Sequence, residues 1–86
     1  SVFDCFIDER FNYMFSSLIP IFFNEVIDHN LVQVEEMSEK YKITPIEATN
    51  PNTYKIALKN KNESHTIIAI STGGGMIEVI EIDNIN

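Results

Sequence analysis

The sequence of 86 residues contains a single cysteine, Cys5. One cysteine excludes an internal disulfide, and by itself it cannot hold an iron–sulfur cluster or a structural zinc ion. A chain without disulfides is typical of a reducing compartment, so we expect a cytoplasmic protein. The apolar neighbours of Cys5 indicate a small buried side chain rather than a reactive thiol.

Basic residues are also scarce. Lys and Arg number 6 against 13 Asp and Glu, which gives a formal net charge of −7. Binding to a phosphate backbone needs clustered Lys and Arg, so we do not expect a nucleic-acid partner. The acidic residues are spread along the chain, and their simplest role is to keep the protein soluble.

Long apolar runs are missing too. The most apolar stretch, Leu18–Phe23, is far shorter than the roughly 20 residues of a membrane-spanning helix. No basic segment followed by a cleavage site marks a signal peptide, and we expect no membrane partner. The length suits one small core, so we expect a single domain over residues 1–86 that is a piece of a larger protein, since the sequence does not begin with Met.

Apolar residues recur at helical spacing after Asp8-Glu9-Arg10, and the acidic start suits the positive end of a helix dipole. Pro20 interrupts the pattern, so either the helix kinks there or Ser16 and Ser17 separate two shorter helices. The periodic positions are Phe11, Phe15, Leu18, Phe22 and Val26, and those that widen the apolar surface are Phe6, Tyr13, Met14, Ile19, Ile21, Phe23 and Ile27. A core of this size should not cover such a helix, so we expect a homodimer through Phe11–Phe23.

The helix should end at His29 and Asn30, because Asn tolerates the left-handed conformation that terminates helices. A second helix is predicted from Leu31 to about Tyr41. The pair Glu36 and Lys40, four residues apart with the acid first, supports helix over strand there.

The following segments are predicted to be extended. Ile43–Ala48 contains Pro45, so we expect an edge strand or a link. Asn50-Pro51-Asn52 is typical of a turn. Tyr54–Lys59 alternates apolar and polar residues, which predicts a strand with one wet face.

Two more strands complete the sheet. Asn60–Glu63 is a polar hairpin loop, and Thr66–Ser71 is apolar on both faces, as a central strand should be. In Met76–Asp83 the alternation slips at Val79-Ile80, which predicts a bulge or a strand covered on both sides. The predicted fold is α+β, with N-terminal helices packed on a small antiparallel sheet and a C-terminal three-strand meander.

Residue types that serve in catalysis are present without a complete active site. His29 fits a helix cap, and His65 fits a surface or ladder position; two histidines without paired ligands make a poor metal site. Ser71, His65 and an acid could be drawn as a triad, but no nucleophile elbow surrounds Ser71. The acids of the last strand, Glu78, Glu81 and Asp83, favour a solvated face.

All three glycines are consecutive, Gly73–Gly75, between two strand-forming runs. Glycine enters positive φ at little steric cost. Backbone N–H groups in such a turn can converge on an anion. The other interpretation is a connection or bulge that lets two strands pair. The sequence leaves both open.

The C-terminal part resembles the β-subunit-type domain of iron–sulfur-dependent L-serine dehydratases (L-serine ammonia-lyases). The resemblance rests on Asn50-Pro51-Asn52-Thr53, the hairpin Tyr54–Ser71, the segment Ser71–Ile77 and the tail Glu81–Asn84. The family has His where this chain has Asn50 and Gly where it has Asn84. The first fifty residues match only loosely.

The resemblance implies an accessory domain of a lyase that is not catalytic on its own and is related to a small effector-binding domain of phosphoglycerate dehydrogenases. Its partner would be the catalytic domain or alpha-type subunit, which would hold a 4Fe-4S cluster, and its ligand a small amino or hydroxy acid. The candidate ligand-binding residues are Asn52, Thr53, Ser71, Thr72, Gly73, Gly74 and Gly75. The alternative is a protein-interaction or dimerisation module without a ligand.

Overall fold

The computed structural model describes residues 2–32, 34, 40–59, 64–74 and 76–85. Its elements are, in chain order, β1 (Val2–Asp8), α1 (Glu9–Met14), the 3₁₀ turn η1 (Ser16–Leu18), α2 (Ile19–Asp28), β2 (Lys40–Ile46), β3 (Tyr54–Lys59), β4 (Ser64–Gly73) and β5 (Met76–Ile85). The described strands form one sheet in the order β2-β1-β3-β4-β5. β1 and β2 are parallel, and the other neighbours are antiparallel.

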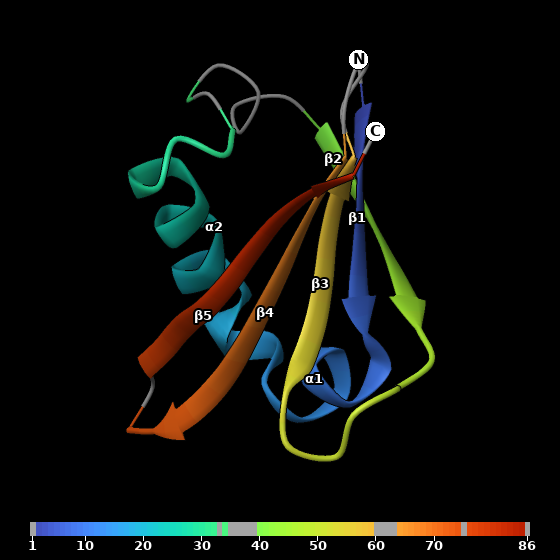
Figure 1. Cartoon of the computed structure of the whole chain (residues 1–86), viewed down its shortest axis with the longest axis vertical. Coiled ribbons are helices and arrows are strands. Elements are labelled where there is room, and N and C mark those ends of the chain that lie inside the picture. The colour runs from blue at the N-terminus through green and yellow to red at the C-terminus, as the bar shows by residue number, and fades with distance from the viewer. Residues whose placement is uncertain (1, 33, 35–39, 60–63, 75, 86) are drawn as a thin grey trace.

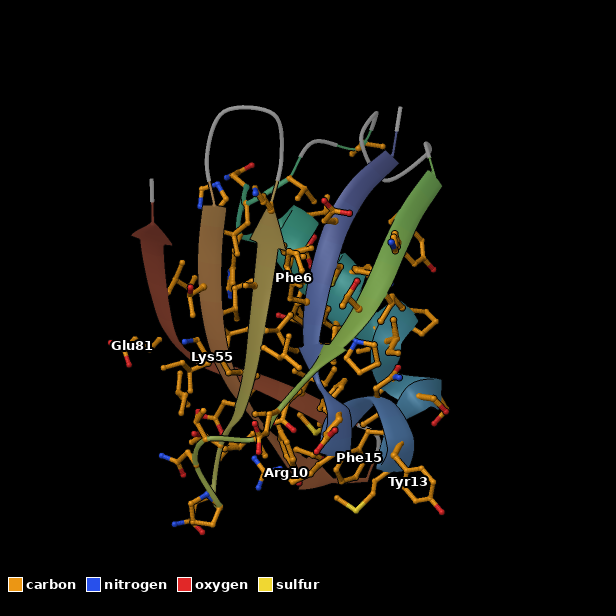
Figure 2. The ribbon with its side chains drawn as sticks, turned by 90° about the vertical axis from the view of Figure 1, so that its right-hand side faces the viewer. Phe6, Arg10, Tyr13, Phe15, Lys55 and Glu81 are labelled. Carbon is orange, nitrogen blue, oxygen red and sulfur yellow. The ribbon has the colours of Figure 1, made fainter. Side chains whose placement is uncertain are left out.

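Both α-helices lie on one face of this sheet (Figures 1 and 2). The α+β class and the C-terminal meander β3–β5 are therefore confirmed. The expectation of a purely antiparallel sheet was wrong, because β1 and β2 pair in parallel. A parallel pair needs a crossover connection, and the helical segment between these two strands supplies it.

β1 is a strand that the sequence analysis did not assign. Cys5 and Ile7 point to the helix face and are 0% exposed, as expected for Cys5, whereas Phe6 lies between them on the opposite face. The placement of Phe6 on a helix was wrong. Three apolar residues in succession lack the alternation that would have revealed the strand.

The first helical segment is broken, as one of the two alternatives predicted. α1 is followed by η1, and α2 then starts with Pro20 in its first turn, where the missing N–H has no helical partner to lose. Asn30 follows α2 with φ of 56°, which confirms the left-handed terminator. No helix in the described ranges is long and apolar enough to cross a membrane.

The predicted helix from Leu31 to about Tyr41 is mostly untested, because residues 33 and 35–39 lie outside the described part. Its end was wrong, since Lys40 and Tyr41 begin β2 and pair with β1. β2 is an edge strand, as the proline in this segment predicted.

The C-terminal hairpins follow the prediction. β3 alternates between buried and more exposed residues. Ile68 of β4 pairs with Glu81, but the next residue, Ala69, pairs with Val79. Ile80 is therefore an extra residue, which confirms the bulge. The predicted loop between β3 and β4 lies outside the described residues.

The aromatic residues of Phe11–Phe23 lie mostly inside the molecule. Phe11 and Phe22 are 0% exposed and Phe23 is 5% exposed, so the argument that the core could not cover them was wrong. Two short helices in place of one long helix allow this, because each turns a separate apolar side to the sheet. The homodimer itself stays a prediction.

The face of the sheet that points away from the helices is called the open face here (Figure 2). Side chains alternate between the two faces along each strand. Those considered below as part of the open face are Phe6, Lys42, Lys55, Ala57, Thr66, Ile68, Ile70, Glu78 and Glu81.

Candidate interaction surface at helix α1

Helix α1 begins where β1 ends, and Asp8 makes the transition. Its Oδ1 accepts a hydrogen bond of 3.0 Å from the backbone N–H of Arg10. This bond satisfies one of the N–H groups that have no partner in a first helical turn. Glu9 adds a negative charge at the positive end of the helix dipole. These local contacts fix where the six-residue helix starts.

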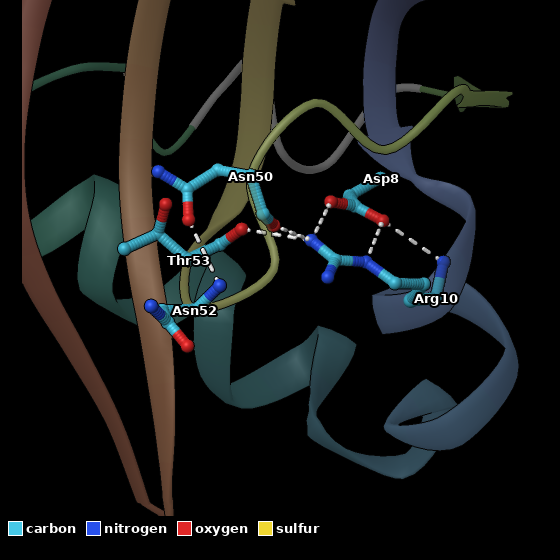
Figure 3. A network of polar contacts seen from close by, with 5 residues as sticks. All are labelled: Asp8, Arg10, Asn50, Asn52 and Thr53. Atoms are coloured by element: carbon cyan, nitrogen blue, oxygen red, sulfur yellow. Dashed lines mark hydrogen bonds and ion pairs between the residues drawn. The ribbon is translucent and has the colours of Figure 1, made fainter.

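The Arg10 side chain ties this helix start to the turn before β3 (Figure 3). Its Nε and Nη2 donate to the two carboxylate oxygens of Asp8 at 3.1 and 2.8 Å. Nη2 also donates to the backbone carbonyls of Asn50 and Thr53, the second at 2.9 Å. The guanidinium carbon lies 4.9 Å from the ring centre of Tyr54, a cation–π contact. One side chain thus joins α1 to a turn 40 to 43 positions later in the chain.

Asp8 and Arg10 neutralise each other. Burial by itself would raise the pKa of the Asp8 carboxyl, but the hydrogen bonds and charge of Arg10 outweigh burial and hold that pKa below its usual range. The hydrogen bond with Asp8 raises the pKa of the Arg10 guanidinium. The Asp8 side chain is 2% exposed and that of Arg10 is 27% exposed. The pair therefore holds the turn in place and offers no net charge to an external anion.

An aromatic cluster fixes the orientation of α1. The rings of Phe11, Phe15 and Tyr54 lie 5.5 to 5.7 Å apart between centres, at tilted or edge-to-face angles that aromatic pairs favour. With Phe11 turned inward, the helical period turns Tyr13, two positions further on, outward. Met14 is exposed as the last residue of the helix. Tyr13 is 88% exposed and Met14 is 56% exposed.

These outward side chains border a shallow pocket of about 640 Å³. The residues that line it, called the α1 surface below, are Glu9, Arg10, Asn12, Tyr13, Met14 and Pro45. Tyrosine, methionine and arginine are enriched at protein interfaces, and a shallow pocket fits a side chain of another protein better than an enclosed metabolite.

The candidate ligand-binding residues fall into two groups at one end of the sheet. Asn52 is exposed, and its backbone N–H donates to Asn50 Oδ1 at 2.8 Å. The backbone carbonyl of Thr53 accepts a hydrogen bond from Arg10 Nη2. Ser71 is half-buried and pairs with Ile77 near the end of β4. Among the described residues, no hydrogen bond joins the turn before β3 to the end of β4.

The glycine turn is a hairpin connection in the part that the structure describes. Gly73 pairs with Met76, and Gly74 between them has φ of 65°. A Cβ at Gly74 would meet nothing within 4 Å, so the glycine is required by its backbone conformation and not by a close neighbour. Thr72 and Gly73 belong to β4, and Gly75 lies outside the described residues. This geometry favours the connection over the anion site.

Other reactive residue types have structural positions. Burial raises the pKa of the Cys5 thiol to about 12, so this side chain is not a nucleophile near neutral pH. His65 lies in the ladder, as one alternative expected, but it is 7% exposed and is not a surface residue. Within the described ranges, no three His, Cys, Asp or Glu side chains are grouped so that they could hold a metal ion.

The α1 surface was not predicted from the sequence. Tyr13 and Met14 were assigned to an apolar face that surrounds a long helix, and their exposure follows from the early end of α1. The long-range contact of Arg10 has no local signal either, since Asn50 and Thr53 offer backbone carbonyls that every residue has.

Comparison with protein-family models, with curated proteins and with solved structures finds no match to this chain.

Proposed function

We propose that this domain is a protein-interaction module that binds a protein partner through the α1 surface. The observation that carries the proposal is the exposure of Tyr13 and Met14, at 88% and 56%, on a helix held by buried aromatic packing and by the Arg10 network. A helix that is already fixed loses little conformational freedom on binding, which favours affinity.

The partner that fits this surface has an apolar side chain at its centre and positive charge at its rim. Tyr13, Met14 and Pro45 supply apolar contact area around the pocket. Glu9 is exposed at its border, the charge of Arg10 is already neutralised by Asp8, and the whole chain carries −7. Complementary charge speeds association and makes binding weaken as salt rises.

The test compares three forms of the chain: the parent, the double variant Tyr13→Ser/Met14→Ser, and Met76→Ser. Met76 is 67% exposed on β5 and serves as the matched control for loss of an exposed apolar side chain. A partner isolated on the immobilised parent is titrated against each form by calorimetry at low and high salt.

We expect the double variant to weaken binding at least about tenfold, because exposed aromatic side chains dominate interfaces of this kind. Met76→Ser should stay within about twofold, as a surface change outside the contact. Equal affinities for all three forms, or binding that strengthens with salt, would contradict the proposal.

A second candidate is an accessory domain of an iron–sulfur L-serine dehydratase, with the catalytic part as its partner and a small amino or hydroxy acid as its ligand. The sequence resemblance supports it. One structural observation also supports it. Tyr54 at the start of β3 pairs with Ala69 near the end of β4, so the turn before β3 and the glycine turn after β4 lie at the same end of the sheet. Both segments belong to the resemblance.

The second candidate is tested with a cluster-loaded serine dehydratase catalytic subunit from the same genome. We expect the chain to make no pyruvate alone, since one cysteine cannot ligate a cluster. Added to the catalytic subunit, it should shift the KM for L-serine. No binding to that subunit, together with no heat of binding for L-serine or small hydroxy acids, would reject this candidate and leave the first intact.

A further inference from the structure

One row of side chains runs across three neighbouring strands of the open face. It consists of a base, an apolar residue and an acid, one from each strand. Lys55 of β3 is paired with Ile68 of β4, and Ile68 is paired with Glu81 of β5. Lys55 and Glu81 are exposed and Ile68 is half-buried. Figure 2 shows Lys55 and Glu81 on strands of this face. Neighbouring strands lie about 4.8 Å apart, so the backbone positions of Lys55 and Glu81 lie about 10 Å apart with Ile68 midway.

The middle strand stays apolar on one side of this row and becomes polar on the other. Ile70 lies on the open face two positions further along β4 and is half-buried, next to Glu78 of β5. Thr66 lies two positions before Ile68 and is 5% exposed. β4 therefore presents an apolar line formed by Ile68 and Ile70, with a lysine on one side and acids on the other.

We propose that a second copy of this chain covers the open face, with β4 packed on β4 of the partner. The two copies are related by a two-fold axis that runs parallel to β4 and directly above it. This axis places β3 of one copy opposite β5 of the other. Ile68 then faces Ile68 of the partner subunit. Lys55 faces the partner's Glu81, and Glu81 faces the partner's Lys55. The same lysine–glutamate pair therefore occurs twice in this isologous interface.

This arrangement has the form of ordinary sheet-on-sheet packing. Two sheets pack about 10 Å apart with their strands nearly aligned, and their side chains fill the space between them. The apolar line of β4 forms the centre and the charges form the rim, as in stable interfaces. Rim charges set the register more than the affinity, so the dimer is expected in the micromolar range. This contact does not involve the segment Phe11–Phe23.

The test exploits the predicted facing of opposite charges. Sedimentation equilibrium is run from roughly 1 µM to 1 mM on the parent, on Lys55→Glu and on Glu81→Lys. We expect the parent to pass from the 9.9 kDa monomer to the dimer, and each single variant to weaken association at least about tenfold. An equimolar mixture of the two variants should associate as well as the parent, because each then faces the opposite charge.

Two further variants keep the result decisive. Lys42→Glu makes the same charge change on the same face, but on the edge strand β2, three strands from β4, and should leave the apparent Kd within about twofold. Ile68→Ser removes the central contact without a charge change and should also give monomers. Circular dichroism and thermal unfolding establish that each variant is folded.

Three results would overturn the proposal: a parent that stays monomeric over the whole range, a mixture that does not restore association, or a Lys42→Glu variant as defective as Lys55→Glu. The last would place the axis over another strand. The α1 surface takes no part in this contact, so either proposal can fail alone.

Discussion

The two faces of the sheet use adjacent residues of the same strand for different purposes. On the helix face, Ile67 and Ala69 are 0% exposed beneath the helices. On the open face, Ile68 and Ile70 are half-buried and stand beside charged side chains. Between Ile67 and Ile70 both faces of β4 are apolar, so hydrophobicity does not by itself decide which face is covered within the chain. The helices determine which face is covered, because they bury their apolar sides against one face of the sheet only.

Folding and association therefore draw on separate sets of side chains in this small domain. Changes on the helix face should lower the free energy of unfolding, and changes on the open face should alter association.

Phe11→Ala should lower the free energy of unfolding by about 3–5 kcal/mol, since it leaves a cavity at a fully buried aromatic position. Urea unfolding measures the loss. Tyr13→Ala, two positions along the same helix at an 88% exposed site, is the control and should change stability by less than about 0.5 kcal/mol. Equal costs at the two positions would mean that α1 is not anchored as described.

Asp8→Asn should lower the free energy of unfolding by roughly 1.5–3 kcal/mol at neutral pH, because it breaks the charge-assisted bonds to Arg10. The pKa of the folded carboxyl is depressed, so its stabilising effect is present above the unfolded pKa of about 3.9 and is lost as pH falls through the folded pKa. The gap between parent and variant should therefore narrow below about pH 4.

Urea titrations at several pH values measure this gap. Glu9→Gln, an exposed neighbour, is the control and should show no comparable pH dependence. A gap between Asp8→Asn and the parent that stays constant from neutral to acid pH would show that the Asp8–Arg10 pair does not act through its charge.

Gly74→Val should cost about 1–2 kcal/mol, because a β-branched residue is strained at φ of 65° even though the space around it is open. Gly74→Asn is the matched control, since Asn tolerates this conformation, and should cost less. Binding of small carboxylates to the folded fraction is measured in parallel. Loss of stability with unchanged binding identifies the turn as a connection, whereas loss of binding by a stable variant favours an anion site.

Sequence patterns predicted the parts of the fold that depend on local chemistry. The terminator Asn30 and the alternation of β3 follow from residue type and spacing. The break at Ser16 and Ser17 and the bulge at Ile80 were each one of two alternatives that the spacing left open. β1 and the parallel pairing with β2 do not, because apolar residues in succession carry no period and strand partners are chosen by tertiary contact.

The candidate surface could not be predicted for the same reason. Its two exposed side chains look like core residues in the sequence, and only the actual length of α1 and the inward turn of Phe11 reveal them. The Arg10 network depends on backbone carbonyls from a distant turn. The residues chosen around the glycine turn stay a prediction.

The separation of the two faces is tested most directly by making one substitution at two adjacent positions of β4. Ile67→Ala and Ile68→Ala are each examined by urea unfolding at low concentration and by sedimentation equilibrium. We expect Ile67→Ala to lose about 2–5 kcal/mol of stability. Ile68→Ala should lose less than about 1 kcal/mol while its association weakens clearly. Equal losses of stability at both positions, with association unchanged in Ile68→Ala, would contradict the account.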